Sequence, residues 1–283
     1  MPPTPRLGRL LAAPPLFWLW AFFAGPLIYL LALSFATKGP YGEVEWTLTI
    51  ENYQRTLEWI FVTIFMHSYW LALLTTLLCL LISIALSWSI ATLPRAYRSW
   101  TLVVITVPFL MNLITRIYAL KSVVSYDGPA VAVGRILFGD GIDPLDLSQN
   151  QFLVLYGMVA TYLPFMLFPI YVSFEKFDFQ QIEAVYDLGG SPRRALLQVL
   201  LPQLRPAIAS GIVMVFVPTL GEYVIPDLLG GAKVMLSGNL ITEEFLKTRD
   251  WPFGAALATE LIVFMSLVTW IFATWGARRG GQQ

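Results

Sequence analysis

The uncharged stretch WIFVTIFMHSYWLALLTTLLCLLISIALSWSIATLP, from Trp59 to Pro94, decides the fold class. As one helix its 36 residues would extend about 54 Å, whereas the hydrocarbon core of a bilayer is about 30 Å thick. Such a run is typical of a membrane-crossing helix, because lipid offers an irregular backbone no hydrogen-bonding partners. We expect the crossing itself at about residues 67–93, with the part up to about His67 at the membrane interface.

Five further runs with few charged residues predict five more crossings. The first run, from Leu10 to Thr37, follows Arg6 and Arg9 and could also be read as a signal peptide. Its 28 residues exceed the roughly 7–15 residues of a signal core, which favours an uncleaved span. The chain is therefore predicted to form one all-α polytopic transmembrane domain, residues 1–283, with six helices at about 10–37, 67–93, 99–125, 149–174, 206–230 and 254–277.

The composition supports this class and excludes others. Hydrophobic residues make up 57% of the 283 residues and charged residues only 13%. The formal net charge is zero, which argues against a nucleic-acid binder. One histidine and one cysteine leave no metal-ligand set and no Cys–His pair. A serine or carboxylate enzyme stays open on these counts, but no pattern in the sequence indicates one, so we expect no catalytic residue, no metal site and no enzyme.

The charges are distributed asymmetrically across the predicted membrane. The segments on the side of the termini carry 10 basic and 4 acidic residues, and the opposite segments with the outer span ends carry 6 and 12. By the positive-inside rule, both termini are expected in the cytoplasm. The outer face is acidic, which a cationic solute would find favourable.

The longest cytoplasmic connection, residues 175–205, is predicted to form two short helices. Apolar residues recur at helical spacing before Gly189, which ends the first helix. Ser191 is followed by Pro192, a pair typical of a helix start, and Pro202 and Pro206 are expected to stop the second helix. Spacing alone leaves two interpretations open, a docking site for another protein and a connector lying on lipid headgroups.

The same loop resembles a known motif. Glu183-Ala184-Val185, Gly189 and Val199-Leu200-Leu201-Pro202 have the spacing of the EAA loop, E-A-A-x3-G-x9-I-x-L-P, of ABC importer permease subunits. The resemblance implies a type I permease fold in which the loop forms a coupling helix between spans four and five and sits in a cleft of a cytoplasmic ATPase. It assigns the coupling contact to Glu183, Ala184, Gly189, Ser191, Leu201 and Pro202.

Other stretches resemble the polyamine branch, the spermidine and putrescine permeases. They are Asn52-Tyr53, residues 116–121, residues 162–166, residues 221–231 and Asp250-Trp251-Pro252-Phe253. The resemblance implies inward transport of a polyamine by alternating access. The alternatives are an ABC permease for another small solute, such as iron or an opine, and a secondary transporter or channel that ATP does not drive.

The chain has no G-x-x-x-x-G-K-[ST] phosphate-binding loop, so it is expected to bind no cofactor directly. The resemblance implies that ATP and Mg are bound by two copies of a partner ATPase. It further implies a second homologous permease as the other half of a heterodimer, an extracytoplasmic substrate-binding protein, and a bacterial inner membrane.

Ionisable residues inside the membrane are candidates for the substrate pathway. Glu222 lies between Pro218-x-x-Gly221 and Pro226, so the fifth span is expected to break there. The carboxylate with Tyr223 could bind a substrate ammonium by charge and cation–π attraction, or Glu222 could instead pair with Arg116 or Lys121, or face a second permease. Asp227 and Asp127, nearer the outer span ends, are further candidates for attracting cations, and equally for solvated helix-end acids. For Glu260 in the sixth span, pairing with a partner subunit and contact with substrate remain equal alternatives.

Overall fold

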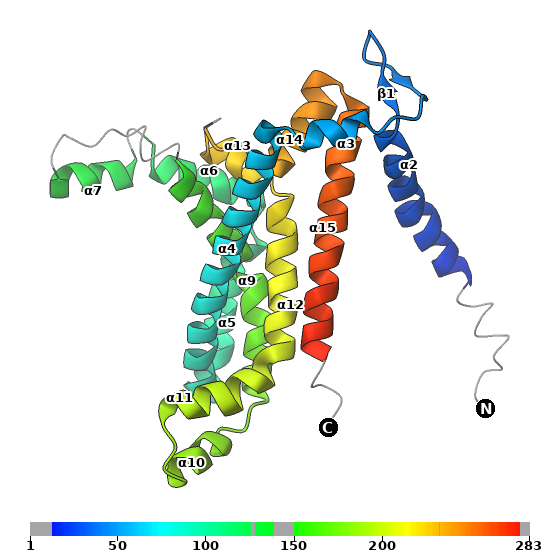
Figure 1. Cartoon of the computed structure of the whole chain (residues 1–283). Coiled ribbons are helices and arrows are strands. Elements are labelled where there is room, and N and C mark those ends of the chain that lie inside the picture. The colour runs from blue at the N-terminus through cyan, green and yellow to red at the C-terminus, as the bar shows by residue number, and fades with distance from the viewer. Residues whose placement is uncertain (1–12, 126–127, 139–149, 232, 278–283) are drawn as a thin grey trace. The chain divides into compact units, whose positions relative to one another are not determined.

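The structure, a computed structural model, describes residues 13–125, 128–138, 150–231 and 233–277 and is mostly helical (Figure 1). Five of its helices are long and apolar enough to cross a membrane: Ala13–Ser34, Trp59–Thr92, Gln151–Glu175, Pro192–Leu220 and Trp251–Ala277. A bent pair, Arg95–Leu110 with Leu113–Val123, gives a sixth when it is counted as one span. Within the described residues, the number of spans agrees with the sequence prediction.

The chain divides into two compact units. Unit 1 comprises Met1–Val62 and Leu240–Val263, and unit 2 comprises Thr63–Asn239 and Phe264–Gln283. The divisions fall inside the helices α4 (Trp59–Thr92), α14 (Ser237–Glu243) and α15 (Trp251–Ala277). The two units therefore share helices.

Unit 1 consists mainly of short helices and two short strands. Its other elements are η1 (Trp20–Ala24), α2 (Gly25–Ser34), β1 (Thr37–Lys38), β2 (Val44–Glu45), α3 (Glu51–Thr56) and η3 (Glu244–Thr248). The two strands pair antiparallel, with Thr37 opposite Glu45. The buried Asn52 donates from Nδ2 to the carbonyl oxygens of Ser34 (3.0 Å) and Ala36 (2.8 Å), which satisfies acceptors that the end of α2 leaves open.

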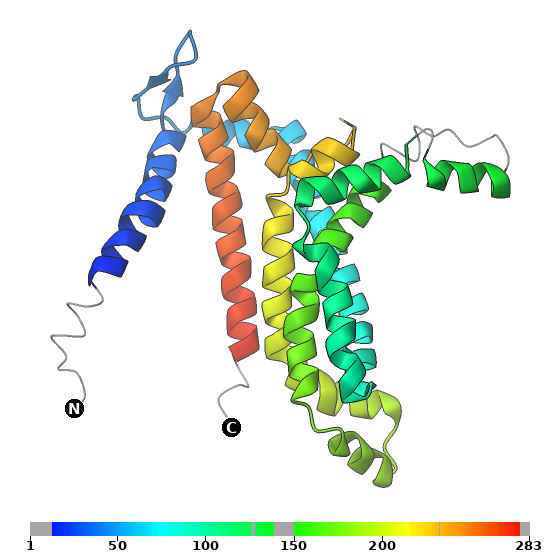
Figure 2. The same cartoon turned by 180° about the vertical axis from the view of Figure 1, so that it is seen from behind.

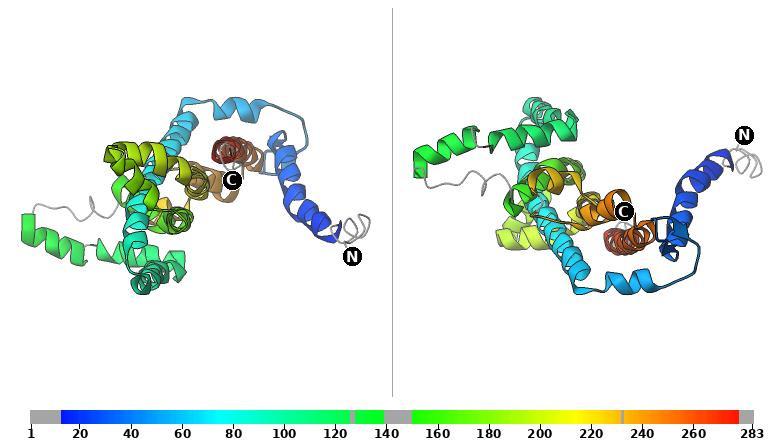
Figure 3. Two further views of the ribbon diagram at one scale, coloured as in Figure 1. Left: turned by 90° about the horizontal axis from the view of Figure 1, so that it is seen from below. Right: turned by 90° about the horizontal axis from the view of Figure 1, so that it is seen from above.

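Unit 2 is a bundle built around α9 (Gln151–Glu175) and α12 (Leu201–Leu220), which lie side by side (Figures 1 and 2). Seen end-on, α4 lies next to α9 (Figure 3), and Thr75 and Cys79 of α4 contact Met158 and Val159 of α9. The remaining helical elements are α5 (Arg95–Leu110), α6 (Leu113–Val123), α7 (Pro129–Phe138), α10 (Gln180–Asp187), α11 (Pro192–Arg194), η2 (Ala195–Leu200) and α13 (Val224–Leu229).

The predicted third span, residues 99–125, is not one straight helix. α5 and α6 meet at 91°. Pro108 lacks a backbone N–H inside the last turn of α5, and Asn112 starts a new helix because its side chain accepts the N–H of Ile114 at 2.8 Å. The charged residues Arg116 and Lys121 therefore lie on a separate helix.

The second span is a single helix that begins before His67, and the expected position of its first part at the membrane interface stays a prediction. α4 runs as one helix from Trp59 to Thr92. No proline or glycine occurs between these residues, so nothing in the backbone favours a break.

The prediction that Pro202 and Pro206 end the second loop helix was wrong. Residues 192–220 form one continuous helical segment through α11, η2 and α12. Pro202 lies at the start of α12 after a π-helical stretch, where a missing N–H is tolerated, and Pro206 lies inside the helix. The loop before Pro192 is thus joined to the fifth span by continuous helix.

Candidate functional site

The loop between α9 and α12 presents an exposed turn. Gly189 has φ +75°, a conformation that side chains other than glycine rarely adopt, and no atom lies within 4 Å of where its Cβ would be. Its N–H donates to the carbonyl of Tyr186 at 2.9 Å. Ser191 begins the next helix by accepting the N–H of Arg194 at 3.4 Å. Glu183, Ala184, Gly189 and Ser191 are all exposed, so the structure brings four of the six predicted coupling residues to the surface of one short segment.

The other two predicted coupling residues are placed differently. Leu201 and Pro202 are half-buried in the first turn of α12. Their position suits a role in joining the turn to the span rather than in surface contact.

Aromatic side chains fix this loop to the bundle. The ring of Phe179, just before α10, lies 5.6 Å from that of Trp88 near the end of α4, and Trp88 lies 6.0 Å from Phe174 of α9. Ile182 faces inward and is buried, and Gln203 Nε2 donates to Gln181 Oε1 at 2.6 Å. The loop therefore contacts α4, α9 and α12.

The fifth span breaks at Glu222, as predicted. α12 ends at Leu220 and α13 begins at Val224. Glu222 is buried at 7% exposure, its Oε1 accepts the N–H groups of Val224 (2.9 Å) and Ile225 (3.3 Å), and its Oε2 accepts the hydroxyl of Tyr162 (2.5 Å). The carboxylate therefore caps α13 and ties the break to α9.

A second segment, Ser237-Gly238-Asn239, supports the same break. Ser237 Oγ donates to the Leu220 carbonyl at 2.7 Å, and Asn239 Nδ2 donates to the Tyr223 carbonyl at 3.0 Å. A Cβ on Gly238 would lie 2.8 Å from the Glu222 carbonyl oxygen, so only glycine fits this close backbone approach. Sequence reasoning missed these residues and the partner role of Tyr162, and its one available signal was the turn-forming Ser-Gly-Asn composition.

The remaining pathway candidates differ in accessibility. Tyr223 is 47% exposed, and Asp227 is exposed on α13, where its N–H donates to the Tyr223 carbonyl at 3.1 Å. Asp127 lies outside the described residues. Glu222, Tyr223 and Asp227 thus lie within or just after the same helix break. Glu222 is buried, whereas the Tyr223 ring and the Asp227 carboxylate are exposed.

The alternative pairing of Glu222 with Arg116 or Lys121 is not what the structure contains. In the described part of the chain, the ion pairs are Lys38–Asp250, Arg55–Asp250 and Lys247–Glu243. Glu260 is half-buried and accepts the hydroxyl of Thr56 at 2.7 Å. Among the described residues, no group of three or more acids, cysteines and histidines could hold a metal ion.

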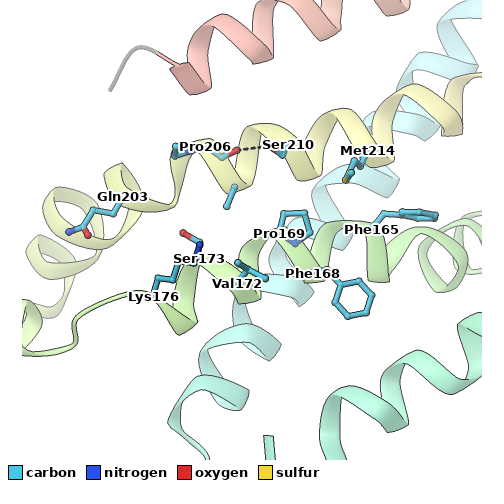
Figure 4. A pocket seen from close by; sticks show the side chains of 11 residues that line it. Phe165, Phe168, Pro169, Val172, Ser173, Lys176, Gln203, Pro206, Ser210 and Met214 are labelled. Atoms are coloured by element: carbon cyan, nitrogen blue, oxygen red, sulfur yellow. Dashed lines mark hydrogen bonds between the residues drawn. The ribbon is translucent and has the colours of Figure 1, made fainter. Parts of the chain in front are cut away.

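A groove of about 580 Å³ lies between α9 and α12 (Figure 4). Phe165 and Met214 lie at one end, and Lys176 and Gln203 lie at the other. The lining is mostly apolar and its one charged residue is basic. A cationic solute would not find this groove favourable, so the break at Glu222 remains the better candidate for a pathway.

Residues 83–280 match the family described as "Binding-protein-dependent transport system inner membrane component". The spermidine/putrescine transport system permease protein PotB of Salmonella typhimurium (strain SL1344) is 36% identical to this chain, and the alignment covers 93% of this chain and 90% of that protein. PotB of Escherichia coli (strain K12) is 35% identical over 93% of this chain and 94% of that protein.

The fold is also similar to that of a solved protein. A bacterial ABC transporter involved in the import of the acidic polysaccharide alginate matches with a TM-score of 0.72 and 15% identity, over 97% of this chain and 96% of that chain. This likeness shows the fold alone, and it confirms the type I permease architecture expected from the EAA-like loop. The match over residues 83–280 and the two PotB relatives show that this chain belongs to the family of inner membrane components of binding-protein-dependent transport systems, the permease subunits of ABC importers.

Proposed function

We propose that this permease imports a polyamine, putrescine or spermidine, as one half of a heterodimer with a second homologous permease. The observation that carries the substrate class is the 36% identity to PotB over 93% of the chain. The buried carboxylate at the break, Glu222, supports it, because no cation of the described residues pairs with this group and a protonated polyamine is attracted to a carboxylate.

In this proposal the substrate approaches the break through the exposed residues. The Tyr223 ring offers a cation–π surface, and Asp227 offers a solvated carboxylate. Glu222 acts from behind them through its charge, while its oxygens keep α13 capped. Alternating access would then move the break between outward-facing and inward-facing arrangements.

We further propose that two copies of a cytoplasmic ATPase, which bind ATP and Mg, drive this motion through the exposed turn of Glu183, Ala184, Gly189 and Ser191. The continuous helix from Pro192 to Leu220 supports this route, since it connects the turn directly to the break. A substrate-bound extracytoplasmic protein delivers the polyamine on the opposite side. Both termini of the chain then lie in the cytoplasm of a bacterial cell, as the basic residues on that side indicate.

The test is uptake of radiolabelled putrescine and spermidine into proteoliposomes that contain both permeases, the ATPase and the binding protein. ATP-dependent accumulation is the expected result. Uptake by the purified chain without any ATPase would identify a secondary transporter or channel instead, and ATP-dependent uptake of iron or an opine but not of polyamine would reassign the substrate.

A further inference from the structure

One end of α4 is hydrogen-bonded to the helix break at Glu222. Ser68, which is 1% exposed, donates from Oγ to the Ile64 carbonyl at 2.8 Å and accepts the Ser237 N–H at 2.8 Å. Ser237 in turn donates from Oγ to the Leu220 carbonyl at 2.7 Å. Ser237 begins α14 and Leu220 ends α12, so these bonds use backbone groups that helix ends leave open. They join α4 to the last residue of α12, two positions before Glu222.

The segment that begins at Ser237 also packs directly on the backbone of the break. A Cβ on Gly238 would lie 2.5 Å from the Gly221 carbonyl oxygen and 2.8 Å from that of Glu222. No flexible side chain lies between the two backbones to absorb a displacement. Glu222 is fixed in the same turn, because its Oε1 accepts two N–H groups at the start of α13. A displacement of residues 237–238 therefore moves the residue that carries the carboxylate.

The other end of α4 contacts the loop between α9 and α12. The Trp88 ring lies 5.6 Å from the ring of Phe179, just before α10, and 6.0 Å from the ring of Phe174 in the last turn of α9. Trp88 and Ser68 lie about 30 Å apart along one helix that no proline or glycine interrupts. Because a sharp kink needs such an interruption, a displacement of α4 along its axis at Trp88 is also a displacement at Ser68.

Between its two ends, the buried side of α4 makes weak polar contacts. Thr75 Oγ1 donates to Met158 Sδ of α9 at 3.7 Å, and a thioether is a weak acceptor. Further along, the fully buried hydroxyls of Ser83 and Ser87 have no hydrogen-bond partner among the described residues. Packed helices without strong cross-links can slide past each other in small shear movements. Such a movement of α4 along α9 would carry the contacts at its two ends with it.

We propose that α4 connects the loop between α9 and α12 to the break, in parallel with α12, and that Ser68 and Ser237 are positioning residues that act on transport through Glu222. A movement of the loop then reaches the break from two sides, through the end of α12 and through the 237–238 segment. The inference rests on the proposed function, in which the loop contacts the ATPase and the break lies on the substrate pathway.

The number of polyamine molecules taken up per ATP hydrolysed tests the positioning role, because a loss of folded protein lowers both rates and leaves their ratio unchanged. In proteoliposomes with both permeases, the ATPase and the binding protein, Ser68→Ala and Ser237→Ala should each lower this ratio about fivefold, the factor that one hydrogen bond is worth. Ser68→Thr, which keeps the hydroxyl, should retain most of it. Ser83→Ala is the matched control, since it removes a buried hydroxyl of the same helix that has no described partner. A wild-type ratio for Ser68→Ala, or an equal loss for Ser83→Ala, would overturn the inference.

The two ends of α4 should act as one path. Trp88→Leu removes the ring contacts with the loop and should also lower the ratio of uptake to ATP hydrolysis. The double variant with Ser68→Ala should lose little more than the more affected single variant, although independent sites this far apart have additive effects. Additive losses would show that the two ends act separately, which contradicts the proposed connection.

A measurement without substrate separates this inference from the proposed function. Leu228→Cys places a thiol at a half-buried position of α13, and the chain's own cysteine, Cys79, is buried. In the complex with the ATPase, ATP should change the rate at which a maleimide labels this thiol, and Ser68→Ala should reduce that change. A full ATP response with Ser68→Ala would overturn the inference. A wild-type complex without any ATP response would refute the proposed ATPase drive and the inference together, whereas a normal response without polyamine uptake would refute the proposed substrate alone.

Discussion

Two buried acids, Glu222 in unit 2 and Asp250 in unit 1, perform the same local task in different electrostatic settings. They are 7% and 5% exposed, and each caps a helix, Glu222 at α13 and Asp250 at α15, where Oδ1 accepts the Phe253 N–H at 3.2 Å. Asp250 is neutralised, because its Oδ2 lies 3.0 Å from Arg55 and 4.0 Å from Lys38. Glu222 has only neutral donors among the described residues.

This difference in ion pairing predicts a structural role for Asp250 and a transport role for Glu222. Among the described residues only neutral donors contact the oxygens of Glu222, so no described cation offsets the charge of this carboxylate. At Asp250 the charge is used within the chain, where it joins β1, α3 and α15. A transported cation should therefore respond to the charge at position 222 and not to the charge at position 250.

The largest expected effect on uptake comes from the exposed turn at Gly189, the proposed ATPase contact, and not from either buried acid. Loss of uptake there sets the scale for the smaller effects expected at Glu222 and Asp250. Gly189→Asp and Glu183→Lys should each lower ATP-dependent uptake below detection, because they add a charge or invert one on the proposed ATPase contact. The open space around Gly189 limits the folding cost to its backbone strain. Copurification of the ATPase measures the contact, and Gln180→Lys, an exposed change on the same loop, should leave it intact. Normal uptake by both variants would refute the coupling role.

The next effect sharpens the comparison at Glu222. Glu222→Gln keeps an oxygen for the α13 cap but removes the charge, so the transport efficiency kcat/KM for polyamine should fall about tenfold, which corresponds to about 1.4 kcal/mol. The thermal stability in detergent should change little. Tyr162→Phe is the matched variant: it keeps the charge and removes one donor, so it should cost about 1 kcal/mol of stability with KM nearly unchanged. Wild-type kinetics for Glu222→Gln would remove this residue from the pathway.

The same two regions show what the sequence could predict. Glu222 and the break were predictable because prolines, a glycine and an acid stand together in an apolar run. The turn at Gly189 was predictable because its motif is local and its glycine requirement is a backbone property, whereas its contact with an ATPase stays a prediction. Tyr162, Ser237 and Gly238 could not be identified as its supports, since they contact the break from 60 and about 16 positions away and such pairing leaves no local pattern. The bend after Leu110 was also missed, because Pro108 and Asn112 lie in a run whose composition still reads as one span.

A smaller effect on transport is expected at Asp250. Asp250→Asn retains an oxygen for the α15 cap but loses the ion pairs, so it should lower stability by about 1–2 kcal/mol, a reduced figure because Arg55 and Lys38 remain partly exposed to solvent. The KM for polyamine should not change. A double-mutant cycle with Arg55→Met should show that most of the loss is shared between the two residues. A raised KM with unchanged stability would contradict the contrast drawn between the two acids.

The smallest effect is expected at Glu244, an acid beside Asp250 in unit 1. It is buried, and its Oε2 has no hydrogen-bond partner among the described residues. Burial first, and then the charge of Asp250, raise its pKa above the usual value, against the opposing influence of Arg55, Thr248 and Lys38. Because the folded chain holds this proton more tightly than the unfolded chain, stability is lost as pH rises from the ordinary glutamate pKa through the raised one.

Glu244→Gln removes this titration. The variant should gain thermal stability relative to wild type as pH rises through that window, and the difference between the two proteins should be constant below it. Melting temperatures of the two proteins in detergent, measured from about pH 4 to 8, check this. A difference that does not change with pH would show that Glu244 ionises as easily in the folded chain as in the unfolded one. A pH-dependent difference in melting temperature, with polyamine KM unchanged, would show that Glu244, like Asp250, affects stability and not transport. Of these three buried acids, Glu222 would then be the one whose charge is expected to affect transport.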